Sequence, residues 1–250
     1  FRVRIGPLLR HERDKRRYES LFRPPGWRQR VLRSSCLLSF PRRCEPAVLD
    51  DRPVPGALYW FAGQGSAFAP LLRDHALLGE ELRAIVRPEF LPGPENRPFI
   101  AVHVRRGDFS MPSSTELARG QHNFRIPIDW YVAALRSLRN SLGRAVAALV
   151  FSDGTERELE PLLAERFTTM SRSKHAASDL LKMSEAGALI ASGSTFSMWA
   201  SFLGQVPAIW YPGQRRELLL REGPGAEPEW SAGPFQRAFL DAARARLMLR

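Results

Sequence analysis

Several features of specialised protein classes are scarce in this chain. Its 250 residues include only two cysteines, Cys36 and Cys44, whose spacing matches neither a disulfide framework nor a metal site. No apolar run approaches the roughly 18 residues of a transmembrane helix, and no signal-peptide pattern is present. Hydrophobic residues make up 44% of the chain and charged residues 25%, which excludes collagen-like and intrinsically disordered proteins. The length predicts one large domain or two small ones.

Lysine is also scarce, since Lys15, Lys174 and Lys182 are the only three, and arginine supplies most of the net charge of +11. Residues 1–45 contain 13 Lys and Arg against 4 Asp and Glu, a balance of +9, whereas residues 46–250 contain 24 against 22. A basic segment can bind nucleic acid or another anionic surface. An arginine-rich, lysine-poor composition is also typical of a GC-rich genome, and both interpretations stay open. Because the remainder of the chain is nearly neutral, we expect no nucleic-acid partner.

The composition changes at residues 88–98, which contain four prolines and one glycine. Before this segment, residues 1–57 are weakly patterned, a strand is predicted over 57–61, and one or two short helices are predicted over 68–85. After it, short apolar runs alternate with amphipathic segments. Predicted strands cover 99–104, 145–151, 187–191 and 207–211; predicted helices cover 129–142, 155–167, 179–186 (capped by Ser178), 195–203 and 234–249.

This alternation predicts an α/β fold with a parallel sheet built of βαβ units. We place the domain boundary between an arginine-rich N-terminal region, residues 1–95, and a sheet domain, residues 96–250. In such sheets ligands bind at the carboxyl ends of the strands. Polar residues follow three of the predicted strands, at 103–108, 152–154 and 192–195.

The first polar segment reads His-Val-Arg-Arg-Gly-Asp and begins at His103. His103 and Arg105 alternate onto one face of the predicted strand, where an arginine can bind a diphosphate through its bidentate guanidinium. The other arginine, Arg106, then pairs with Asp108 or with a neighbouring helix. The alternative is a solvated turn with a weak surface ion pair.

The other candidates have two interpretations each. Residues 192–195, before a helix, form either an anion-binding helix N-terminus or a plain N-cap. Asp179 either accepts hydrogen bonds from the N1–H and 2-amino group of a guanine or complements a helix dipole. Asp153 is either a turn residue or a wall of the cleft. No P-loop, dinucleotide-binding, zinc-protease, CxxC, GxSxG or Asp-x-Asp motif is present, so we expect no bound metal.

Together and in this order, these segments resemble glycosyltransferase family 11, the α-1,2-fucosyltransferases of the GT-B fucosyltransferase superfamily. The resemblance rests on an H-x-R-R-G-D-[FY] motif, a Tyr-rich helix, an F-S-D segment and a D-L-x-x-M-S-x-C-x-x-x-I-I-x-N-S-T-F-S-W-W block. The matching segments of this chain are 103–109, 130–134, 151–153, 179–184 and 189–199.

The resemblance implies a GT-B-like fold with a Rossmann-type donor domain at 96–250 and a partial acceptor-side domain at 1–95. It also implies an inverting, metal-independent transfer of L-fucose from GDP-fucose to a hydroxyl of a glycan acceptor. In that reaction Arg105 would hold the β-phosphate and stabilise the charge on the leaving GDP. His103 would contact the nucleotide and Asp179 would read the guanine.

The remaining residues of the implied site have lesser roles. Asp153, Ser194, Thr195 and Phe196 would complete the donor pocket. Arg106 and Asp108 would have a structural role, as a pair.

The chain departs from the family pattern in several places. Ala186, Gly193 and Met198 replace Cys, Asn and Trp, and the glycine-rich G-G-x-G-N-Q-[ML]-F segment is missing from residues 1–56. The alternatives are an N-terminally truncated enzyme or a divergent member, including another type of fucosyltransferase or a non-catalytic nucleotide-sugar-binding relative. Composition and the absence of N-x-[ST] sequons favour a bacterial cytoplasmic enzyme over a Golgi membrane protein. Membrane association of the full-length protein stays open.

Overall fold

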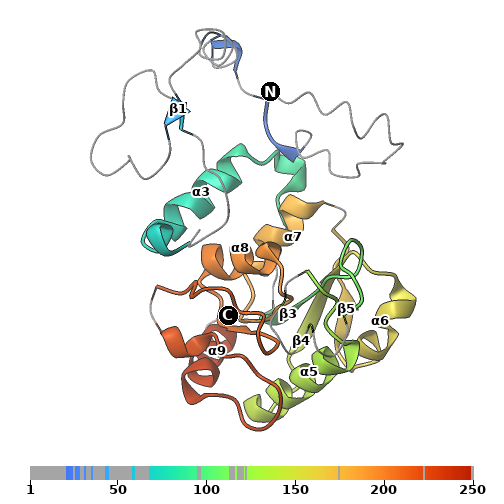
Figure 1. The fold of residues 1–250 in the computed structure, drawn as a ribbon. Helices are drawn as coiled ribbons and strands as arrows, with labels where there is room; N and C mark the ends of the chain where they lie inside the picture. Colours follow the sequence, from blue (N-terminus) through green and yellow to red (C-terminus); the bar gives the residue numbers. More distant parts are fainter. Residues whose placement is uncertain are drawn as a thin grey trace. The chain divides into compact units, whose positions relative to one another are not determined.

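The structure is a computed structural model, shown in Figure 1. It describes residues 21–24, 26–28, 31, 35, 43–44, 58–59, 68–94, 97–112, 116, 121, 123–173, 175–221 and 223–248. The chain divides into two compact units, residues 1–67 and 68–250.

In the first unit, the short strands β1 (Arg43–Cys44) and β2 (Leu58–Tyr59) pair in parallel. β2 lies inside the strand predicted over 57–61. Most of the arginine-rich segment 1–45, with Cys36, lies outside the described residues. The division into an acceptor-side region up to residue 95 and a donor-binding domain after it stays a prediction.

A five-stranded parallel sheet forms the centre of the second unit, in the order β5-β4-β3-β6-β7. The strands are β3 (Phe99–Val104), β4 (Ala147–Ser152), β5 (Thr168–Met170), β6 (Ala188–Ile190) and β7 (Ala208–Ile209). The chain therefore builds the sheet outward from β3 to β5, then returns to the other side of β3. This order is that of a Rossmann fold, and its switch point lies between β3 and β6. The predicted α/β class is confirmed.

Helices cover both faces of this sheet (Figure 1). On one face lie α5 (Ile128–Leu142), α6 (Glu156–Leu163) and α9 (Arg237–Met248). On the other lie α7 (Ala176–Met183) and α8 (Thr195–Gly204), with α3 (His75–Ile85) packed on α8. Single 3-10 turns are η3 (Ala69–Leu71), η4 (Pro88–Phe90) and η5 (Pro224–Ala226).

Strand β3 shows why the sheet is buried on both faces. Ile100, Val102 and Val104 belong to the core under α5, α6 and α9, whereas Phe99 and Ala101 belong to the core under α8. Successive side chains of a strand point to opposite faces, so an apolar run without alternation must be covered twice. The continuous apolar sequence of this strand therefore requires helices on both sides.

Local signals set two of the helix ends. The side chain of Thr155 accepts a hydrogen bond from the Glu158 backbone N–H, and the Glu158 carboxylate accepts one from the Thr155 N–H, forming a capping box before α6. At the C-terminal end of α5, Gly143 adopts a left-handed φ of 69°, which glycine reaches without steric cost.

Two sequence-based predictions were wrong in this unit. The helix predicted over 155–167 ends at Leu163, and the three-residue strand β5 follows it. Ser178 does not cap a helix at Asp179, because α7 begins at Ala176 and its N-cap is His175. Asp179 nevertheless lies in the first turn of α7.

Within the described parts of the chain, no helix has the length and apolar character needed to cross a bilayer.

Candidate functional site

Two of the predicted polar segments meet at the switch point of the sheet. His103 lies at the end of β3, and Ser192 and Ser197 lie after β6 and in α8. Nδ1 of His103 is 2.6 Å from the Ser197 Oγ and 3.1 Å from the Ser192 Oγ. The Ser192 backbone N–H donates to the Ser197 Oγ at 3.2 Å. These contacts attach the turn between β6 and α8 to the end of β3.

His103 is an uncharged member of this cluster. Its side chain is buried. The pKa of His103 is lowered from 6.5 to about 3, mainly by burial and also by the Arg105 guanidinium, while Asp153 opposes the shift. At neutral pH the ring is therefore neutral and positions the turn through hydrogen bonds. Its predicted contact with a nucleotide stays a prediction.

Arg105 leaves the end of β3 and is held by two carboxylates. Its Nη2 forms an ion pair with the Asp108 carboxylate, and its Nη1 lies 3.0 Å from Asp153 Oδ2. The guanidinium also lies 5.1 Å from the centre of the Phe109 ring. The Arg105 side chain is 22% exposed, so it is fixed in place yet reachable from solvent. Asp108, assigned with Arg106 to a structural pair, thus forms an ion pair with Arg105.

Asp153 connects the ends of β3 and β4. Besides its contact with Arg105, its Oδ1 accepts a hydrogen bond from the Arg106 backbone N–H at 2.7 Å. A Cβ at Gly107 would lie 2.7 Å from Asp153 Oδ2, so a side chain there would push this carboxylate from its place. Asp153 therefore holds the turn that presents Arg105, and its place in the wall of a cleft stays a prediction.

The side chain of Arg106 is buried in the protein. It is 8% exposed, and a Cβ at Gly154 would lie 2.8 Å from its Cγ. Burial raises the pKa of the neighbouring Tyr131, and the Arg106 cation partly offsets that rise. These surroundings are consistent with the structural role predicted for Arg106.

The predicted anion-binding turn lies at the N-terminus of α8. Ser194 is the N-cap, and its Oγ accepts a hydrogen bond from the Phe196 N–H at 3.1 Å. Thr195 is the first residue of the helix, and the Phe196 ring lies 5.4 Å from the His103 ring. Phe196 is therefore beside the end of β3 and Ser194 serves as a cap, while the donor contacts of all three residues stay a prediction.

A cavity of about 570 Å³ opens at the same edge of the sheet, beyond the end of β5. Ser171 and Ser173 line it, and the Ser171 Oγ donates to Asp179 Oδ1 at 2.8 Å. Burial raises the pKa of Asp179 from 3.8 to about 6, although hydrogen bonds from both serines oppose the shift. The Asp179 carboxyl thus lies directly behind the wall of a cavity large enough for a nucleoside. The sequence did not single out these two serines.

The family model of glycosyl transferase family 11 matches residues 66–210. The chain belongs to glycosyl transferase family 11. This match contains all five strands of the parallel sheet together with Arg105, Asp153, Asp179 and the turn before α8. The resemblance inferred from the motifs is therefore confirmed at the level of the family.

The comparisons with curated proteins and with solved structures give less information about this chain. No curated protein matches the chain. Among solved structures, the crystal structure of POFUT1 in complex with GDP has a TM-score of 0.37 and 15% sequence identity to it. That similarity covers 66% of this chain and 58% of the POFUT1 chain, so this chain spans less than two thirds of the length of that structure.

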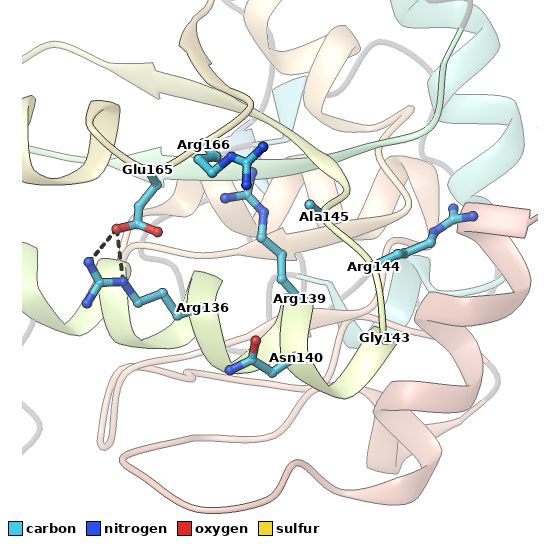
Figure 2. A pocket seen from close by; sticks show the side chains of 8 residues that line it. All are labelled: Arg136, Arg139, Asn140, Gly143, Arg144, Ala145, Glu165 and Arg166. Carbon is cyan, nitrogen blue, oxygen red and sulfur yellow. Dashed lines mark hydrogen bonds and ion pairs between the residues drawn. The ribbon is translucent and has the colours of Figure 1, made fainter.

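The family 11 chain has a second cavity, of about 540 Å³, lined largely by arginines (Figure 2). Figure 2 shows Arg136 facing Glu165, with hydrogen bonds of 2.9 and 2.6 Å to one carboxylate oxygen. Arg139 donates to the Val146 and Phe167 carbonyls and to Thr168 Oγ1, and Arg144 donates to the Leu247 carbonyl. These arginines fasten the end of α5 to β4, β5 and α9, at the amino ends of the strands. The cavity is thus structural rather than part of the candidate site.

Among the residues that the structure describes, no group of three or more His, Cys, Asp or Glu side chains has the geometry of a metal site.

Proposed function

We propose that this protein transfers L-fucose from GDP-fucose to a sugar hydroxyl, with inversion and without a metal ion, and that the fucose is joined α-1,2 to a galactoside. Membership of glycosyl transferase family 11 supports a glycosyl transfer. The observation that carries the proposal is the position of Arg105 at the switch point. It follows β3 directly, two residues after His103, which contacts Ser192 and Ser197 of the neighbouring turn, and the cavity near Asp179 lies at the same edge of the sheet.

In the proposed reaction, the acceptor hydroxyl oxygen attacks the anomeric carbon as the bond from that carbon to the β-phosphate oxygen breaks, and the hydroxyl proton passes to water. Negative charge then develops on the leaving GDP, and the Arg105 guanidinium stabilises it. The hydroxyls and N–H groups at the start of α8 would hold the diphosphate in position, since a helix N-terminus favours anions. His103 is neutral and contributes by fixing that turn.

A bound donor would compete with the carboxylates of Asp108 and Asp153 for the Arg105 guanidinium. The Asp108 side chain is 52% exposed and that of Asp153 32%, so solvent screens both ion pairs. Exposed ion pairs contribute only about 0–1 kcal/mol, whereas a charged diphosphate offers several acceptor oxygens to one guanidinium. A donor can therefore displace one carboxylate while the other keeps Arg105 oriented.

A transfer assay tests this proposal. The chain is incubated with GDP-fucose and a panel of galactosides, with and without EDTA, and GDP release and the product's anomeric configuration are measured. We expect GDP release and an α-fucoside in both conditions, with no transfer from UDP-galactose. Binding of GDP without transfer would instead support the non-catalytic alternative. Absence of both binding and transfer would exclude the proposed function.

Replacing Asp179 with asparagine should weaken GDP binding and leave the weaker UDP binding unchanged. The carboxylate can accept hydrogen bonds from both guanine N–H groups, and uracil does not present that pair. Because the pKa of Asp179 is raised to about 6, the affinity of the native protein for GDP should increase as the pH rises through that value. In calorimetric titrations the asparagine variant should lose the part of this pH dependence that comes from Asp179 and keep the part that comes from the GDP phosphate.

The raised pKa of Asp179 also determines how the free energy of unfolding changes with pH. Between the unfolded pKa of 3.8 and the native value of about 6, the native carboxyl keeps its proton while the unfolded one loses it. The free energy of unfolding should therefore fall as the pH rises through this window. The matched control is Asp241→Asn on α9, where an exposed carboxylate pairs with Arg237 and Arg244.

If Asp179→Asn discriminates GDP from UDP as well as the native protein does, another group reads the guanine.

A further inference from the structure

Gln214 is a buried amide that ties together three loops at the carboxyl edge of the sheet. It lies in the loop after β7 and is 1% exposed. Its Nε2 donates to the Gln121 carbonyl at 2.9 Å, in the segment between β3 and α5. Its side chain also runs along Gly193, in the turn between β6 and α8. One side chain thus joins the loops that follow β3, β6 and β7.

The contact with Gly193 is so close that a side chain at this position would displace the Gln214 amide. A Cβ built on Gly193 would overlap the Gln214 Oε1 and lie 3.1 Å from its Cδ. Gly193 is not among the glycines with positive φ, so its backbone would accept alanine. What keeps position 193 without a side chain is therefore the space that the Gln214 amide occupies. Arg216, from the same loop, also donates to the Gly193 carbonyl at 3.4 Å.

Hydrogen-bond energy does not explain why a glutamine fills this space. The Oε1 of Gln214 is buried and has no hydrogen-bond partner among the described residues. A buried acceptor without a partner lowers stability, and an apolar side chain of the same length would avoid that cost. Buried polar groups that lower stability are typical of sites kept for function. The unpaired Oε1 packs on Gly193, next to the N-cap of α8.

We propose that Gln214 is a positioning residue for the donor's diphosphate. Packed against Gly193 and bonded to Gln121, its amide sets the place of the turn 192–195 relative to the end of β3, where Arg105 begins. The inference rests on the proposed function, because it assigns that turn to the diphosphate. Gln214 itself acts through the turn and the segment that it joins.

A double-mutant cycle on the Gly193 contact gives the most direct test. Gly193→Ala alone should displace the amide and raise the Kd for GDP about five- to tenfold, because small misplacements of a binding group are costly. Gln214→Ala alone should have a similar or smaller effect. In the double variant the overlap is gone, so its Kd should equal that of Gln214→Ala. Independent, multiplicative effects of the two substitutions would contradict the proposed contact.

An isosteric variant separates positioning from stability. Gln214→Met keeps the volume but removes the bond to Gln121, and we expect an unchanged or higher melting temperature. The GDP Kd and the KM for GDP-fucose should each increase about fivefold, with a smaller change in kcat. The matched control is Gln205→Met, at the C-terminal end of α8, where the amide bonds Phe202, Leu219 and Arg221. That variant should melt at a lower temperature and keep the native Kd.

The outcomes distinguish the two proposals. If the native protein binds GDP and Gln214→Met has the native Kd and KM, the positioning role is wrong while the proposed function stands. If Gln214→Met loses only melting temperature, its role is structural and the inference fails. If the native protein binds neither GDP nor GDP-fucose, the proposed function fails and the inference fails with it.

Discussion

Replacing Arg105 with alanine is expected to reduce the rate of fucosyl transfer by about two to three orders of magnitude, the usual effect of removing one group that stabilises transition-state charge. The guanidinium is held at the end of β3 by Asp108 and Asp153 and is partly exposed. A donor diphosphate can therefore reach a cation that is already oriented. Initial rates with saturating acceptor, together with the Kd for GDP, measure the loss.

Two variants serve as controls for Arg105. Arg105→Lys keeps the positive charge but loses the bidentate geometry, so it should recover part of the activity. Arg136→Ala removes an arginine that is also hydrogen-bonded to a carboxylate, Glu165, but lies at the opposite edge of the sheet. That variant should transfer fucose at the native rate. Equal losses in Arg105→Ala and Arg136→Ala would show that overall charge or stability, and not a donor contact, is responsible.

Gly204→Ala should produce the largest loss of stability. Gly204 ends α8 where this helix crosses the end of α7, and an added Cβ would overlap the Ser184 carbonyl oxygen. It would also lie 2.6 Å from the Ser184 carbonyl carbon and 2.8 Å from its Cα, so backbone must move. Overpacking of this kind costs about 3 kcal/mol. For a domain of this size that lowers the melting temperature by roughly 10 °C.

Gly79→Ala provides the matched comparison, because Gly79 also lies in a helix that packs on α8. Its added Cβ would meet only the Arg83 Nη1 at 3.6 Å and the Leu203 carbonyl oxygen at 3.9 Å, which are ordinary contacts. The higher helix propensity of alanine should then raise stability by about 0.5–1 kcal/mol. Thermal unfolding followed by circular dichroism compares the two. If both variants melt at the native temperature, α7 and α8 do not approach each other as closely as described.

Strong local patterns could be read from the sequence alone. The strand predicted over 99–104 matches β3, and the helix predicted over 129–142 matches α5 within one residue at its start. Both predictions succeeded because an uninterrupted apolar run and a helical stripe each require burial of a particular kind. β5 was missed since three residues, two of them threonines, carry too little pattern. Only the need for a strand between two successive helices could have indicated it.

The candidate site was also predicted only in part. The residues at the ends of β3 and β6 were predicted together, because parallel strands place their carboxyl ends at one edge. The partners of these residues were not predicted. Arg105 pairs with Asp153, 48 positions later, only because β3 and β4 are neighbours. Ser171 and Ser173 join Asp179 through a strand that the sequence did not reveal.

By itself, the sequence determined the α/β class, the family and the positions of the candidate residues, since these depend on local periodicity and on short motifs. Only the tertiary structure decided the strand order, the two carboxylates on Arg105, the neutral state of His103 and the packing of Gln214 on Gly193. Each of these depends on which distant segments become neighbours and on how far they exclude water. Burial and contacts across the sheet set pKa values and close approaches, and no single segment of the chain contains that information.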